Sequence, residues 1–124
     1  MQGKSKENWR VGQRCLSDGD LNAATSRLYY GVLQSIIAWA RAKKGYNDVH
    51  GTHSAMYRYI SNEGHIRKVF GPTFRKMQAL RETADYSPQP PSLHKLNELL
   101  PTCERMIDYY RKKAIVTETE GTKP

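Results

Sequence analysis

The chain has 124 residues and a mass of 14.2 kDa, which is enough for one domain with a modest core. Its 20 Lys and Arg against 12 Asp and Glu give a formal charge of +8, and an apolar content of 38% favours a folded chain over a disordered one. The composition excludes a membrane span, a signal peptide and a disulfide framework, so we expect a small cytoplasmic protein with no membrane association.

The first predicted element is a short or peripheral helix at about residues 6–17. Its few apolar positions are Trp9, Cys15 and Leu16. The Asp-Gly-Asp sequence at residues 18–20 is expected to end this helix and to supply the N-cap of the next one.

Residues 21–44 carry the strongest helix signal in the chain. Apolar residues recur there every three or four positions in two adjacent stripes, which makes a face wide enough for the central helix of a bundle. The cations in its last turn and Gly45 directly after it predict the end of the helix.

Two further helices are predicted in the middle of the chain. Residues 46–51 are typical of a loop, and Thr52 can cap a shorter helix that ends near residues 62–64. The Gly-Pro pair at residues 71–72 is expected to open the next helix, because proline fits the first turn. The proline-rich stretch at residues 87–91 ends it.

Ser92 is the predicted cap of the last helix, whose apolar residues keep a three-four spacing as far as Tyr110. Pro101 lies within that spacing and is expected to kink or split the helix. Residues 117–124 are expected to form a flexible tail, which leaves residues 1–116 as one helical domain. The predicted fold is therefore all-α, a bundle of four to five helices, and a bundle of this size is expected to complete its core by pairing into a homodimer.

The positive charge is unevenly distributed along the chain. Fourteen of the 20 basic residues and seven of the 12 acids lie in residues 1–86, a balance of +7. Such an excess is typical of a surface that meets phosphates, and it is equally typical of a well-solvated surface without a partner. Composition alone leaves both interpretations open.

The histidines do not indicate a metal site. His50 and His53 form a His-x-x-His pair, but a third ligand and a nearby carboxylate cluster are lacking. The sequence also has no glycine-rich phosphate loop and no nucleophile elbow. We therefore expect no metal and no cofactor.

Two charged groups and a phenol are predicted to converge near one helix end. Arg81 and Asp85 are four residues apart on a helix, and Tyr86 follows them. They form either a binding site or an ordinary intrahelical ion pair. Tyr29 and Tyr30 flank the apolar face of the long helix, so one can be buried while the other points outward.

Tyrosine alternates with arginine and lysine in two stretches, residues 57–59 and 109–113. Aromatic rings beside arginines can stack on unpaired bases while the cations hold phosphates. The alternative is that these tyrosines fill the core and cover its rim.

Three motifs together resemble the small prokaryotic HEPN proteins. Residues 23–32, AATSRLYYGV, are similar to the family's A-x-S-R-x-Y-Y-A-x-F stretch. Residues 52–54 match the Thr-His-Ser turn that follows it, and residues 80–86, LRETADY, match L-R-x-x-A-D-Y. The order and the spacing agree, and the resemblance covers about residues 8–113.

The resemblance implies an up-down helical bundle that dimerises and binds RNA or nucleotides. Many HEPN proteins are metal-independent endoribonucleases in toxin–antitoxin, CRISPR-linked or abortive-infection defence systems, and several are encoded beside a minimal nucleotidyltransferase. It implies that an arginine or histidine contacts phosphate, that tyrosines stack or hydrogen-bond, and that an aspartate orients an arginine. The binding residues that it assigns are Arg27, Tyr29, Tyr30, His53, Arg81, Asp85 and Tyr86.

The nuclease branch of the family uses an arginine and a histidine separated by four to six residues. Here the next histidine after Arg81 is His94, with twelve residues between them, so that pair is not found in its expected place. Arg81 and His53 are the remaining catalytic candidates. We therefore expect an RNA- or nucleotide-binding component of a defence or toxin–antitoxin module. The alternatives are an active endoribonuclease and a non-catalytic subunit that binds a nucleotidyltransferase or a larger complex.

Overall fold

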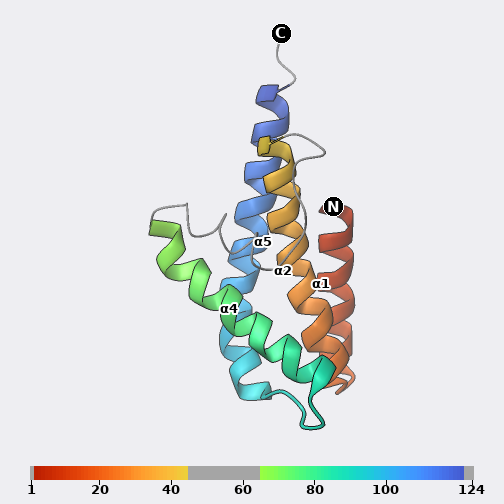
Figure 1. The fold of residues 1–124 in the computed structure, drawn as a ribbon. Helices are drawn as coiled ribbons and strands as arrows, with labels where there is room; N and C mark the ends of the chain where they lie inside the picture. The colour runs from red at the N-terminus through yellow and green to blue at the C-terminus, as the bar shows by residue number, and fades with distance from the viewer. Residues whose placement is uncertain (1, 45–64, 122–124) are drawn as a thin grey trace.

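A computed structural model describes residues 2–44 and 65–121, and within these two ranges it contains four α-helices and no strand (Figure 1). The predicted all-α helical bundle is confirmed at that level. None of the described helices is long and apolar enough to cross a membrane. The helices are α1 (Gln2–Ser17), α2 (Leu21–Lys44), α4 (His65–Tyr86) and α5 (Leu93–Gly121).

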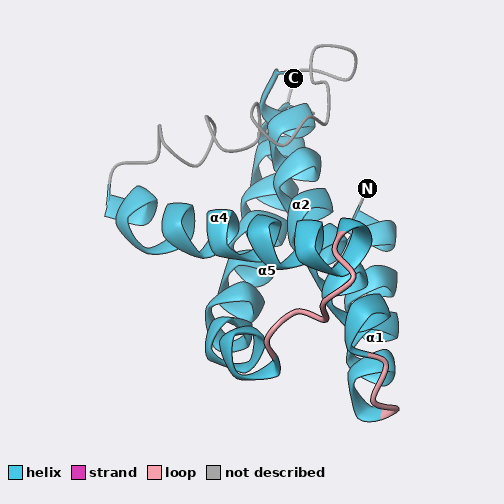
Figure 2. Ribbon diagram, turned by 60° about the horizontal axis from the view of Figure 1, so that its bottom comes forward, coloured by secondary structure: helices cyan, strands magenta, loops and turns pink. Residues whose placement is uncertain are grey.

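Helix α2 is the centre of the arrangement, because it packs against all three of the other described helices. Helices α1 and α5 run along α2, whereas α4 crosses the others obliquely (Figures 1 and 2). Helix α1 packs chiefly on α2, while α4 and α5 also pack on each other. The described helices therefore depart from a strict up-down order at α4.

The hydrophobic core lies where α2, α4 and α5 meet. All three helices contribute large side chains with no exposed surface, as their apolar periodicity predicts. Their largest fully buried apolar residues are Tyr29, Tyr110, Phe74, Leu28, Ile36, Met77, Leu96, Met106 and Val32.

The turn between α1 and α2 is built as the sequence predicts. Gly19 has a φ of +82°, a conformation that glycine adopts without strain. Its amide donates to the Leu16 carbonyl at 3.1 Å, and the Asp20 amide donates to the Cys15 carbonyl at 2.9 Å, which together close a Schellman motif. The Asp20 carboxylate then accepts from the Ala23 amide at 3.2 Å and caps α2.

Helix α1 is longer than the predicted 6–17, because it begins at Gln2. It reaches α2 through two glycines: a Cβ at Gly12 would lie 2.7 Å from Leu28 Cγ, and a Cβ at Gly31 would lie 3.2 Å from the Trp9 amide nitrogen. Ser5 Oγ donates to the Gly31 carbonyl at 2.6 Å. Close backbone approach and polar contacts therefore hold a helix that has few apolar residues.

Pro72 and Pro101 lie inside helices, so the predicted helix start at the Gly-Pro pair was wrong, and the last helix is not split at Pro101. A kink at Pro101 stays a prediction. Helix α4 begins at His65 rather than at the Gly-Pro pair, with Pro72 in its interior, and α5 runs through Pro101 without a break. Both prolines are exposed, so the carbonyls that lose a partner lie toward solvent. Burial of Phe70 and Phe74 on the two sides of Pro72, and of Leu96 and Cys103 on the two sides of Pro101, stabilises the continuous helices.

The ends of α4 and α5 give a mixed result. Helix α4 ends at Tyr86, before the proline-rich stretch as predicted, and Ser92 Oγ accepts from the Lys95 amide at 3.2 Å as the predicted cap. Helix α5 continues to Gly121, past residue 117 where we expected the tail to begin. The predicted loop at 46–51 and the predicted helix from Thr52 lie outside the described residues.

Candidate functional site

Arg81 brings the two longest motifs of the sequence together. It lies near the end of α4 and is buried, with 8% of its surface exposed. Its Nη2 donates a hydrogen bond to the Tyr30 hydroxyl on α2 at 3.1 Å, and its Nε lies 3.4 Å from Asp85 Oδ2. The predicted contact between Arg81 and Asp85 therefore exists, and a second contact joins α4 to α2.

Three tyrosine rings surround the same guanidinium. Its Cζ lies 5.6 Å from the ring centroid of Tyr29, 5.5 Å from that of Tyr30 and 5.8 Å from that of Tyr86. These distances are within the range of cation–π attraction, which is strongest where water is excluded. Five of the seven predicted binding residues therefore form one group, which we call the Arg81 cluster: Tyr29, Tyr30, Arg81, Asp85 and Tyr86.

The members of the Arg81 cluster differ in exposure. Tyr29 has no exposed surface, and its ring packs against Phe74 with centroids 5.6 Å apart. Tyr86 is 78% exposed, while Tyr30 is partly buried. As expected of the Tyr-Tyr pair, one ring is in the core and its neighbour lies further out. Tyr86 is the ring that an external molecule can reach.

Electrostatics in the cluster favour a charged Arg81 guanidinium and a neutral Tyr29 phenol. Burial by itself lowers the pKa of Arg81, but the hydrogen bond to Tyr30 and the nearby Tyr30, Asp85 and Tyr86 oxygens raise this pKa above its usual value. Burial raises the pKa of Tyr29, although the Arg81 charge opposes this effect. The Arg81 guanidinium therefore stays charged and faces the Asp85 carboxylate.

Arg27 lies on a different side of α2, facing α1. It is exposed, and its Nη1 donates to Asn8 Oδ1 on α1 at 2.9 Å. The Asn8 amide nitrogen donates in turn to Gln34 Oε1 on α2 at 2.7 Å. Since its partner is a neutral amide, the charge of Arg27 is not neutralised by this contact.

Two exposed cations of α1, Arg10 and Arg14, lie around the same carboxylate as Arg27, and Lys6 shares their side of the helix. Lys6, Arg10 and Arg14 recur every four residues along α1 and therefore share one side of the helix. A hydrogen bond from Arg10 lowers the pKa of Glu7, and the charges of Arg10, Arg14 and Arg27 lower this pKa further. That influence places Arg14 and Arg27 around the same carboxylate. We call this surface the basic face: Lys6, Arg10, Arg14 and Arg27.

His53, the last of the predicted binding residues and one of the two catalytic candidates, lies outside the described residues. His94 is exposed on α5, where its Nε2 lies 2.9 Å from Glu98 Oε1. Within residues 2–44 and 65–121, no group of three or more His, Cys, Asp or Glu side chains is placed to hold a metal ion.

Comparison of the chain with protein-family models, with curated proteins and with solved structures finds no match. The HEPN resemblance and the roles that it implies remain predictions.

Sequence reasoning missed the basic face except for Arg27. The four-residue spacing of Lys6, Arg10 and Arg14 was the available signal, and all three positions lie within the helix predicted at about residues 6–17. Attention to the weak apolar pattern of this helix left its charged side unexamined. A charged pattern with helical spacing would have been the better guide.

Proposed function

We propose that this chain is an RNA- or nucleotide-binding helical protein of HEPN type, acting in a prokaryotic defence or toxin–antitoxin module. The observation that carries the proposal is the basic face. Its cations are exposed, and they are concentrated on one outer side of the described helices.

The basic face has the charge and the accessibility that phosphates require. Helix α1 carries four Lys and Arg against one acid, Glu7, and that acid is paired with Arg10 through contacts of 2.6 and 3.3 Å. Arg14 and Arg27 lie beside this pair. Exposed Lys and Arg side chains bind phosphates in a salt-dependent manner and fix the position of the ligand.

The Arg81 cluster supplies the aromatic part of the proposed interface. Exposed tyrosine rings can stack on unpaired bases, and Tyr86 is such a ring. In this proposal Arg81 is a positioning residue, because it lies within cation–π distance of Tyr86 while it is itself buried. The phosphate contacts belong to Arg27 and the α1 cations.

Binding to a fluorescently labelled single-stranded RNA, followed by anisotropy at several salt concentrations, tests the proposal. We expect salt-dependent binding, in which each lost phosphate contact reduces the slope of log K against log salt by about 0.7. The triple variant Lys6→Gln, Arg14→Gln and Arg27→Gln should bind about tenfold or more weakly than the wild type.

A second triple variant is the matched control. Lys68, Arg105 and Lys112 are equally exposed but lie on α4 and α5, so their change to Gln removes the same charge from another part of the surface. An equal loss of affinity in both triple variants, or no salt-dependent binding by the wild type, would contradict the proposal.

Recovery of intact RNA after incubation with the protein in EDTA distinguishes binding from metal-independent cleavage. A homodimer and a nucleotidyltransferase partner remain predictions.

A further inference from the structure

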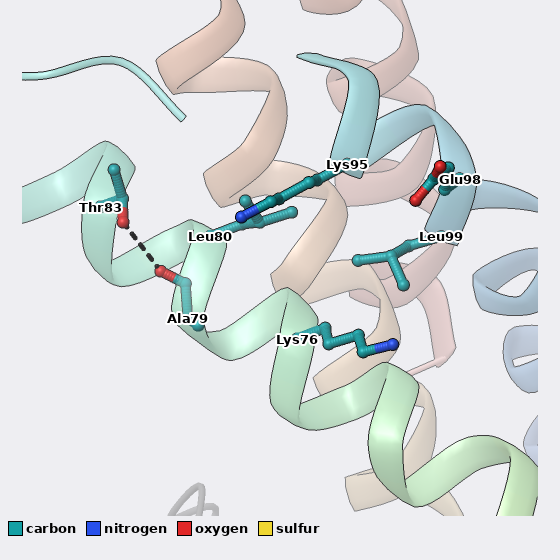
Figure 3. A pocket seen from close by; sticks show the side chains of 7 residues that line it. All are labelled: Lys76, Ala79, Leu80, Thr83, Lys95, Glu98 and Leu99. Carbon is teal, nitrogen blue, oxygen red and sulfur yellow. Dashed lines mark hydrogen bonds between the residues drawn. The ribbon is translucent and has the colours of Figure 1, made fainter. Parts of the chain in front are cut away.

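A pocket of about 360 Å³ lies between α4 and α5 (Figure 3). It is separate from the Arg81 cluster: Leu80 lines the pocket, whereas its neighbour Arg81 reaches Tyr30 on α2. It is also separate from the basic face, which is formed by α1 and α2. The residues that line it are Lys76, Ala79, Leu80, Thr83, Lys95, Glu98 and Leu99.

Helical spacing explains how the two walls form. The α4 residues follow one another at intervals of three, one and three positions, and the α5 residues at intervals of three and one, so each set occupies one side of its helix. Leu80, Ala79 and Leu99 give the pocket an apolar surface. Thr83 Oγ1 donates to the Ala79 carbonyl at 3.1 Å, so its hydrogen is already used.

Two lysines extend into this space from opposite walls. Lys76 extends from α4 toward α5, and Lys95 extends from α5 toward α4 (Figure 3). Within the described part of the chain neither ammonium group has a carboxylate partner. The acid of the pocket, Glu98, is instead 2.9 Å from His94 Nε2.

We propose that this pocket binds a small organic monocarboxylate with an apolar body. Its volume corresponds to about a dozen water molecules at ~30 Å³ each, and ligand pockets typically combine an apolar lining with a few polar groups. The apolar body lies against Leu80 and Leu99, and the carboxylate lies between Lys76 and Lys95.

The charge of the pocket selects a monoanion. Two lysines and Glu98 leave a net charge of +1, which a single carboxylate neutralises. A second negative charge on the ligand would lie in the same small space as Glu98 and would be repelled. Thr83 does not offset this repulsion, because its hydroxyl hydrogen is engaged by the Ala79 carbonyl.

Calorimetric titration of the full chain with octanoate tests the inference. We expect saturable binding with a Kd below about 1 mM, together with weaker binding of octanamide, which has the same length and no charge. Adenosine monophosphate should bind the pocket more weakly than octanoate, as measured by its competition with octanoate for the pocket. Octanamide binding as tightly as octanoate, tighter pocket binding of adenosine monophosphate, or no saturable binding would overturn the inference.

Variants locate the bound carboxylate. Lys76→Met with Lys95→Met keeps the apolar stems and should weaken octanoate binding about tenfold or more, whereas Lys68→Met with Lys112→Met should leave it unchanged. Ala79 is exposed, so Ala79→Trp fills the pocket without entering the core and should abolish binding. Undiminished octanoate binding by the double variant Lys76→Met with Lys95→Met, or by Ala79→Trp, would overturn the inference that octanoate binds in this pocket. RNA affinity, measured on the same proteins, reports separately on the basic face.

Discussion

Helix α2 is held in two different ways on its two sides. On the α1 side the backbones approach closely at Gly12 and Gly31, and the Ser5 hydroxyl bonds across the contact. On the side of α4 and α5 the contact is made by large apolar and aromatic side chains with no exposed surface. The same central helix thus combines a polar, close-packed contact with an apolar core.

The two predicted arginines show what this difference means for function. Arg27 and Arg81 each hydrogen-bond to a neighbouring helix, but Arg27 is exposed on the α1 side and Arg81 is buried on the α4 side. A buried charge that loses its partners is strongly unfavourable, whereas an exposed one is solvated by water. An arginine therefore stabilises the helix packing on the α4 side of α2, at Arg81, and is available to a ligand on the α1 side, at Arg27.

The largest expected effect is on Arg81. We expect Arg81→Met to lower the free energy of unfolding by about 3 kcal/mol, because it removes the hydrogen bond to Tyr30 and the partner of Asp85 from a buried position. Urea denaturation measures the change. The control, Arg27→Met, should stay within about 0.5 kcal/mol of the wild type. Equal losses of unfolding free energy in the two variants would contradict the difference proposed between the α4 side and the α1 side of α2.

Tyr30→Phe sharpens the same comparison. It deletes only the hydroxyl that accepts from Arg81, and we expect a loss of about 2 kcal/mol, since hydrogen bonds to charged groups are the stronger ones. The double variant with Arg81→Met should be little less stable than Arg81→Met alone. Additive losses in this double-mutant cycle would show that the two residues do not act together.

The close contact on the α1 side is tested by Gly12→Ala. The added Cβ would lie 2.7 Å from Leu28 Cγ and 3.0 Å from the Leu28 amide nitrogen, so we expect a loss of about 1.5 kcal/mol despite the better helix propensity of alanine. Gly3→Ala is the matched control in the same helix, because a Cβ there meets nothing within 4 Å. This control should be neutral or slightly stabilising, and thermal unfolding compares the two.

The smallest expected effect comes from Cys103, a buried thiol on the α4–α5 side of α2. Burial raises the pKa of the Cys103 thiol from 9.0 to about 12, so the folded state holds this proton more tightly than the unfolded state. The contribution of this proton to the free energy of unfolding is fully present below about pH 9 and is lost as the pH rises toward 12. Between about pH 8 and about pH 10 we expect the wild type to lose about 1 kcal/mol more than Cys103→Ala, measured by urea denaturation. Identical pH profiles would contradict the buried, protonated thiol.

The parts of the fold that depend on residues close together in the sequence were predictable from it. Asp20 and Ser92 are capping residues at the starts of α2 and α5, and the end of α4 follows from the proline that comes two residues after Tyr86. Each of these signals acts within one helical turn. No distant contact was needed to interpret them.

The rest depended on contacts between helices. Pro72 and Pro101 are unfavourable locally by about 3 kcal/mol each, and only burial of the flanking apolar residues explains why the helices continue through them. The early start of α1, at Gln2, is accompanied by a contact with another helix, in which Ser5 Oγ donates to the Gly31 carbonyl on α2. Local spacing predicted the contact between Arg81 and Asp85 but contained no information on the Tyr30 hydroxyl, 51 positions away.

The turn at Gly19 also has a consequence for the order of folding. It joins α1 and α2 through only three residues, so the contacts of this helical hairpin are close in sequence and its loop closes with little loss of entropy. The bond between Tyr30 and Arg81 must instead close a segment of 51 residues. We therefore expect the α1–α2 hairpin to form early and α4 to dock later, with kinetic φ-values near Gly12 higher than those at Arg81.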